Sequence, residues 1–182
     1  MNSKEELERM KKIRSSLPDN IKEYLFKLGE YLDTDLYFYG SINRPDYHHG
    51  QSDIDIAIFT DNMKSTLTKL QHKLHVKEND FSKVEWKLNN IEIYAYKIKC
   101  DKFIDIKCEI AIYNKKDIEI VLDDLKKYNS IPWYLLGSLF ILKTFYYTLQ
   151  LINKKQYNDY KVLIFNTLSH KKNSDYQVIK QK

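Results

Sequence analysis

Two aspartates lie two residues apart in an otherwise apolar run, as Asp53 and Asp55 in DIDIAIF. In a β-strand, residues i and i+2 point to the same face, so the two carboxylates would lie side by side while the isoleucines turn into the core. Neighbouring carboxylates repel each other and stay ionised together only when a cation lies between them. The pair therefore predicts a divalent-cation site at the start of a strand, and Mg²⁺ is the ion that proteins hold with carboxylates and triphosphate oxygens.

A glycine and a serine, Gly40 and Ser41, come before this pair and end the β-prone run LYFYG. Without a side chain, Gly40 would let backbone N–H groups approach a phosphate closely, and the Ser41 hydroxyl could bond a phosphate oxygen. A triphosphate clamp beside a metal site is what two-metal nucleotidyl transfer requires. We therefore expect a nucleoside triphosphate as substrate and Mg²⁺ or Mn²⁺ as cofactor.

Such a site needs a third carboxylate on a neighbouring strand, and the period-two run over 103–113 offers Asp105 and Glu109. Both would point to one face, but they are roughly 13 Å apart along a strand, so only one can complete the site. Glu109 is favoured, because Asp105 would lie too far from the strand end that carries Asp53. An aspartate is the more usual third ligand, which keeps Asp105 as an alternative metal ligand.

The elements around these residues follow from hydrophobic periodicity and turn residues. Helices are expected first, then strands around the polar loop 41–52, then a hairpin at Asn89-Asn90, and only helices after the long strand. This order predicts an α+β fold, with a mixed sheet that has helices on one face and a helical segment after it. The expected division is a catalytic core over 1–128 and a C-terminal helical segment over 129–182. The expected helices are 3–17, 20–31, 64–74, 115–127, 131–152 and 157–168, and the expected strands are 36–40, 53–59, 84–88, 91–99 and 103–113.

The chain has a net charge of +5, almost all of it from lysine. A basic surface would suit an anionic partner such as a nucleotide or RNA, but the same excess of lysine is typical of an AT-rich coding sequence. The N-terminal segment has no apolar stretch of the kind that signal peptides contain. The longest apolar run, 133–145, is interrupted by polar residues and is too short to span a membrane. We therefore expect a cytoplasmic protein with no membrane partner.

The combination of Gly40-Ser41, Asp53-Ile54-Asp55 and a later acidic strand resembles the DNA polymerase β-type nucleotidyltransferase superfamily. The segments YGSINRPDY, SDIDI and EIAIYNKK are further similar to short poly(A) polymerase-like nucleotidyltransferases of large DNA viruses, which would place the protein in a host cytoplasm. The resemblance covers about residues 36–113 and implies an enzyme that transfers a nucleoside monophosphate. By position, the resemblance implies that Gly40 and Ser41 are the triphosphate-binding pair and that Asp53 and Asp55 are the metal pair. It implies that Asp105 or Glu109 is the third metal ligand.

The resemblance also implies a lysine that reaches the triphosphate from the helical part, and Lys143 in LFILKTFYY is the candidate. The alternative is a lysine on the exposed edge of an apolar helix. Arg44 has the same two interpretations, a phosphate contact or a surface position. Tyr146 and Tyr147 could stack a base or RNA. A rival function is a non-catalytic subunit with the same fold that binds nucleotide or RNA.

Overall fold

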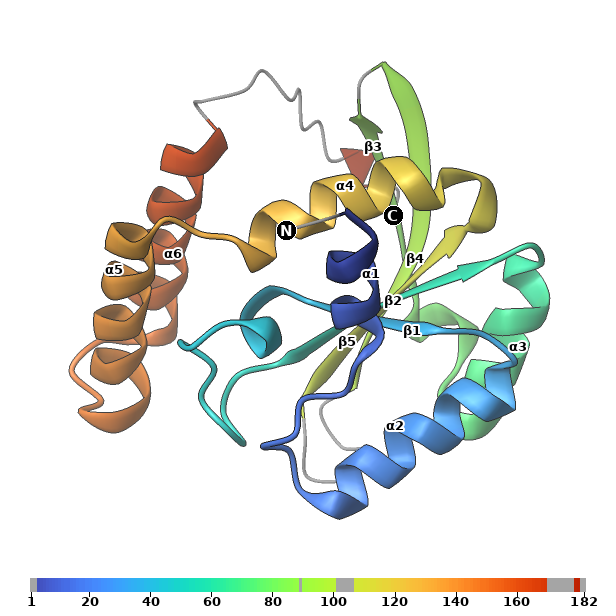
Figure 1. The fold of residues 1–182 in the computed structure, drawn as a ribbon, viewed down its shortest axis with the longest axis horizontal. Coiled ribbons are helices and arrows are strands. Elements are labelled where there is room, and N and C mark those ends of the chain that lie inside the picture. Colours follow the sequence, from blue (N-terminus) through green and yellow to red (C-terminus); the bar gives the residue numbers. More distant parts are fainter. Residues whose placement is uncertain (1–2, 89, 101–106, 170–178, 181–182) are drawn as a thin grey trace.

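A mixed β-sheet forms the centre of the structure (Figure 1). The computed structural model describes residues 3–88, 90–100, 107–169 and 179–180. Within them the strand order is β1-β2-β5-β4-β3-β6, with β2 and β5 parallel and every other neighbouring pair antiparallel. The strands are β1 Leu36–Tyr39, β2 Ile54–Thr60, β3 Ser82–Leu88, β4 Ile91–Cys100, β5 Cys108–Asn114 and the two-residue β6 Ile179–Lys180.

Helices pack against both faces of this sheet. Helices α2 (Asp19–Leu32) and α3 (Met63–Leu74) cover one face, while α1 (Ser3–Lys11) and α4 (Ile118–Asn129) cover the other, as Figure 1 shows. The predicted α+β fold with a mixed sheet is confirmed, but the prediction of helices on one face is wrong in that detail. The physical reason lies in the central strands: the apolar run of β2 sends its isoleucines to one core and Ala57 and Phe59 to the other, so neither face can be left to water.

The C-terminal helices lie beside the sheet, at its left in Figure 1. The single helix expected over 131–152 is shorter: α5 spans Trp133–Lys143, continues as a π-helical turn over Thr144–Thr148, and ends there. The last helix, α6 (Lys154–Ser169), packs against α5. Among the described helices, none combines the length and apolarity needed to cross a bilayer.

Short helical turns connect the remaining elements. The 3₁₀ turn η1 (Gly40–Asn43) follows β1 directly, η2 (Glu78–Asp80) precedes β3, and η3 (Lys115–Asp117) leads into α4. The strand expected over 103–113 is described from Cys108 onward. Asp105 lies outside the described residues.

Candidate active site

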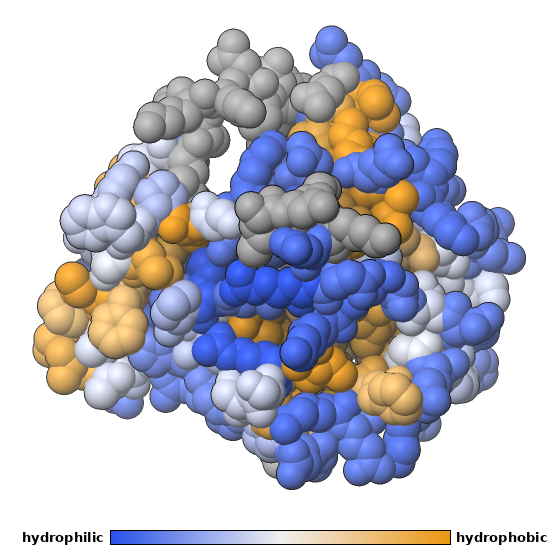
Figure 2. All heavy atoms as spheres, in the orientation of Figure 1, coloured by the Kyte–Doolittle hydropathy of each residue, from blue (hydrophilic) through white to orange (hydrophobic). Residues whose placement is uncertain are grey.

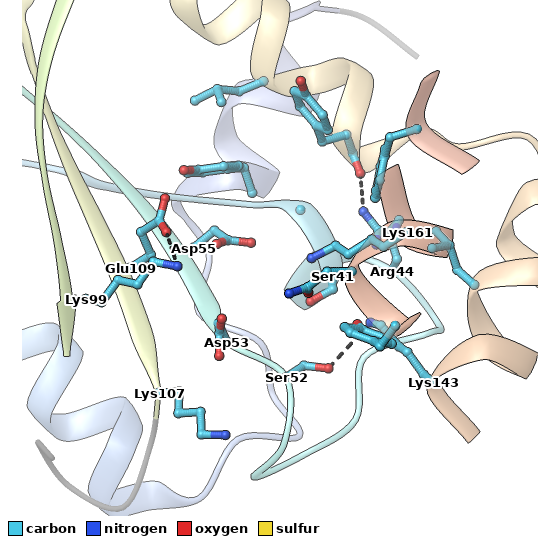
Figure 3. A pocket seen from close by; sticks show the side chains of 18 of the residues that line it. Ser41, Arg44, Ser52, Asp53, Asp55, Lys99, Lys107, Glu109, Lys143 and Lys161 are labelled. Carbon is cyan, nitrogen blue, oxygen red and sulfur yellow. Dashed lines mark hydrogen bonds and ion pairs between the residues drawn. The ribbon is translucent and has the colours of Figure 1, made fainter. Parts of the chain in front are cut away.

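Three acidic side chains point into one pocket from the two parallel strands (Figure 3). Asp53 lies immediately before β2, Asp55 is its second residue, and Glu109 is the second residue of β5. Asp55 and Glu109 are register partners across the β2–β5 pair. The two strands begin at the same edge of the sheet, and this brings together residues that are far apart in the sequence.

The pocket that these carboxylates enter has a volume of about 810 Å³. The sheet, the loop after η1, the end of α4 and the helices α5 and α6 all contribute to its lining. Its wall includes Gly40 and Ser41, so the structure brings together both predicted pairs and Glu109 in one cavity. The cavity is also rich in cations, with six lysines in its lining: Lys97, Lys99, Lys107, Lys143, Lys154 and Lys161.

Gly40 lies against the acidic pair and has the backbone geometry that favours glycine. Its φ is +73°, a left-handed conformation that side chains rarely adopt. Its amide donates to Oδ1 of Asn129, at the end of α4, over 2.9 Å. The Asn43 side chain donates to the backbone oxygen of Phe38 over 2.6 Å, so η1 is tied back to β1. These bonds hold the Gly40–Ser41 segment at the pocket wall.

The electrostatics of the pocket favour a cation at Asp55. Burial, and then the negative charge of Glu109, raise the pKa of Asp55 to about 7. Asp53, the third negative group, is exposed at the pocket mouth and adds to this shift. The repulsion between the neighbouring carboxylates Asp53 and Asp55 is relieved when a divalent cation lies between them. Asp53 and Asp55 therefore fit as oxygen donors for Mg²⁺ or Mn²⁺.

Glu109 is in a different state, because two lysines of β4 neutralise it. Lys97 Nζ lies 3.0 Å from Oε1 and Lys99 Nζ lies 3.5 Å from Oε2. Burial alone would raise the pKa of Glu109, but the charges and hydrogen bonds of the two lysines outweigh it and lower the pKa. Across the described residues, no three His, Cys, Asp or Glu side chains gather closely enough to hold a metal ion. A role for Glu109 as third ligand would require its exchange from Lys97 to the cation.

Lys143 is buried and faces the polar loop between Ser41 and Asp53. Its Nζ donates to the backbone oxygen of Asp46 over 2.8 Å and lies 2.9 Å from Oδ2 of the same residue. Arg44 is also buried and pairs with the Asp46 carboxylate, rather than lying on the surface. Sequence reasoning missed Asp46, because nothing in a polar loop marks one aspartate as the residue that two buried cations will share.

Lys161 of α6 is a second site residue that sequence reasoning missed. It is exposed, lines the pocket, and its charge acts to lower the pKa of Asp55. In the part of the chain that the structure describes, no hydrogen bond or ion pair holds its ammonium group. The only signal in the sequence was a lysine on the polar side of a predicted helix, which is common on any solvated surface.

Aromatic rings line the side of the pocket that the C-terminal helices form. Tyr146 stacks on Tyr157, with ring centroids 4.5 Å apart, and Tyr147 lies 5.8 Å from Tyr157. The predicted pair Tyr146 and Tyr147 therefore faces the pocket, together with a tyrosine from the next helix. Such rings offer flat surfaces on which a base can stack.

Solved structures with a related fold share little sequence with the chain. A structure of Cid1 poly(U) polymerase has 19% identity and a TM-score of 0.35, covering 65% of this chain and 38% of that one. A second Cid1 structure, described for RNA terminal uridylyl transferase activity, has 18% identity and a TM-score of 0.36, covering 72% and 41%. Terminal uridylyl transferase 4 from Trypanosoma brucei with bound GTP has 12% identity and a TM-score of 0.30, covering 57% and 37%.

The chain spans about two fifths of the length of these structures. Their TM-scores are too low to indicate the family or the function of this chain. No curated protein sequence matches the chain. The model of the nucleotidyltransferase domain family matches residues 18–146, which is most of the chain and includes both predicted pairs and Glu109. The chain therefore belongs to the nucleotidyltransferase domain family.

Proposed function

We propose that the protein transfers a nucleoside monophosphate from a nucleoside triphosphate to an acceptor hydroxyl, with release of pyrophosphate. The observation that carries this proposal is the register of Asp55 and Glu109 on parallel strands, with Asp53 beside them and Gly40 against Asp55. In this proposal the acidic cluster would bind the divalent cations, and the Gly40–Ser41 segment beside Asp55 would bind the triphosphate. The acceptor belongs to one of three classes: an RNA end, a protein hydroxyl or a nucleotide hydroxyl.

Asp53 and Asp55 would hold the catalytic Mg²⁺ or Mn²⁺, with Glu109 as the third carboxylate. When bound, such ions lower the pKa of the attacking hydroxyl and stabilise the charge on the triphosphate. Asp55 supplies a half-buried carboxylate, while Asp53 is exposed. Because Lys97 pairs with Glu109, a cation would have to displace that ammonium group before Glu109 could serve as the third carboxylate.

Gly40 and Ser41 would bind the triphosphate from one side and Lys161 from the other. Lys161 replaces Lys143 as our candidate lysine, because it extends into the cavity in Figure 3 and Lys143 points to Asp46. A compact ammonium group suits a phosphate as a point charge. The helical segment over 129–182 would then close the nucleotide cleft and offer the tyrosine rings to the base.

The test is incubation of purified protein with each labelled NTP, Mg²⁺ or Mn²⁺, and a mixture of RNA, protein and nucleotide acceptors. We expect label on one acceptor class with wild type and none with the Asp53→Ala/Asp55→Ala variant. The exposed pair Lys27 and Glu23 on α2 offers a control, because Lys27 does not line the pocket and Lys27→Met removes only a surface ion pair. Label that persists in the double aspartate variant would overturn the proposal.

A second candidate function is a non-catalytic nucleotide-binding subunit, which the two lysines on Glu109 favour. If Lys97 and Lys99 stay on that carboxylate when nucleotide binds, the third ligand is never available. Metal-dependent NTP binding without transfer to any acceptor would support this alternative. The Lys97→Met/Lys99→Met variant tests the cause directly, because loss of both ammonium groups should release Glu109 and allow transfer.

A further inference from the structure

A buried ion cluster forms part of one wall of the pocket and joins three separate segments of the chain. The Asp46 side chain has no exposed surface, and those of Arg44 and Lys143 are 6% and 5% exposed. Arg44 binds the Asp46 carboxylate through two bonds, Nε to Oδ1 at 2.7 Å and Nη2 to Oδ2 at 3.0 Å. Buried ion clusters of this kind add little net stability, and their best-attested use is to specify one geometry.

The cluster connects the loop before Asp53 with two helices. Through Nη1, Arg44 donates to the backbone oxygen of Tyr128 near the end of α4, over 2.6 Å. Lys143 is the last residue of α5, and it reaches the same carboxylate from the other side. The loop is therefore fastened to α4 through Arg44 and to α5 through Asp46, and an ion pair joins these two loop residues.

All three donors of the Lys143 ammonium group are directed at this loop. Its partners are the backbone oxygen of Asp46 at 2.8 Å, Oδ2 of Asp46 at 2.9 Å and Oγ of Ser52 at 3.4 Å. In Figure 3 Lys143 lies beside Ser52, which comes directly before Asp53. No donor is left for a phosphate oxygen in this arrangement.

Ser52 links Lys143 to the backbone segment that leads into Asp53. Its Oγ accepts from the amide of His48 at 3.2 Å, and its own amide donates to the backbone oxygen of His48 at 2.8 Å. These bonds close a turn over 48–52 that ends at the first catalytic aspartate. A displaced Ser52 would therefore displace Asp53 as well.

We propose that Lys143 is a positioning residue, which sets the place of Asp53 through Asp46 and Ser52 and so couples the C-terminal helices to the metal site. The inference rests on the proposed function, because it treats Asp53 as a cation ligand. The helical segment would then have a second role besides closing the cleft. Asp53 would be in the right place to bind a cation only when α5 is packed against the loop through Lys143.

Two variants test the coupling. Lys143→Met removes the ammonium group and keeps an apolar side chain of similar length, and Ser52→Ala removes only the hydroxyl that Lys143 contacts. Lys27→Met is the matched control, because that lysine lies in an exposed ion pair on α2. The measurements are amide hydrogen exchange over 46–56 and over β5, and the affinity for Mn²⁺ alone.

We expect Lys143→Met to speed exchange of the 48–53 amides about tenfold while the β5 amides keep wild-type rates, as in local rather than global opening. Mn²⁺ affinity should fall at least about tenfold, since a misplaced ligand weakens the site. Ser52→Ala should give the same pattern with smaller changes, and Lys27→Met should change neither quantity.

Two results would overturn the positioning role. One is unchanged exchange over 48–53 and unchanged Mn²⁺ affinity with weaker NTP binding, which would make Lys143 a direct triphosphate ligand. The other is faster exchange throughout the chain in both variants, which would make the cluster a general stability element. If wild type itself binds no Mn²⁺, the proposed function fails, and the exchange rates alone decide whether Lys143 orders the loop.

Discussion

Gly40 lies so close to Asp55 that a Cβ at position 40 would come within 2.6 Å of the Asp55 Oδ2 atom. We predict that Gly40→Ala destabilises the fold by about 1–3 kcal/mol and abolishes transfer, because the methyl group must displace the carboxylate. Gly50 separates the two causes of this loss. It has a similar φ of +72°, but a Cβ at position 50 would meet no atom within 4 Å, so Gly50→Ala should show the backbone cost alone and keep activity. Chemical denaturation and the transfer assay measure both, and equal losses of activity in the two variants would contradict the contact.

Replacing Asp55 should separate stability from function. The folded-state pKa of Asp55 is about 7, above its ordinary value of 3.8, so ionisation is disfavoured in the fold and stability falls as the pH rises from about 4 through 7. We predict that Asp55→Asn, without metal, raises the free energy of unfolding at pH 8 by about 1–3 kcal/mol and changes it little at pH 4. The same variant should be inactive. A variant that is less stable than wild type at pH 8 would show that Asp55 makes favourable contacts that outweigh its desolvation.

Asp46 should confer the opposite pH dependence. Burial alone would raise its pKa, but the hydrogen bonds and charges of Arg44, with the charge of Lys143, lower it below 3.8. A lowered folded-state pKa gives stability that is fully present above the unfolded value and is lost as the pH falls through the folded value. We predict that wild type loses stability below about pH 4 by this route. Asp46→Asn should be less stable than wild type at pH 7 by about 3 kcal/mol and show a smaller loss in acid, measured by denaturation at both pH values.

Lys161 should act on the nucleotide and not on the metal. Lys161→Met is expected to raise KM for the NTP about tenfold, because one charge-assisted contact to a phosphate is lost. Mn²⁺ affinity should stay at the wild-type level. Lys155 on the same helix is exposed and does not line the pocket, so Lys155→Met is the control. An unchanged KM with a reduced kcat would argue against a ground-state phosphate contact.

The local sequence was enough to place those site residues whose position depends only on their neighbours in the chain. Gly40-Ser41 at the end of a β-prone run and the alternation through Asp53 and Asp55 depend only on strand period and on the conformational freedom of glycine. The mixed sheet and the α+β order follow from the same periodicity. For that reason the strand positions of both predicted pairs could be predicted from the amino-acid sequence by itself. The family was predicted from the resemblance of these motifs to nucleotidyltransferases, and the matching family model confirms it.

Only the tertiary structure decided which distant residues meet. The parallel register of β2 and β5 opposes Glu109 to Asp55, and the pairing of β4 with β5 brings Lys97 to that glutamate. The second covered face of the sheet and the burial of Lys143 against Asp46 likewise depend on packing between segments far apart in the chain. Charge and side-chain type at one position do not reveal the partner, because long-range pairing is set by how the whole core closes rather than by local periodicity.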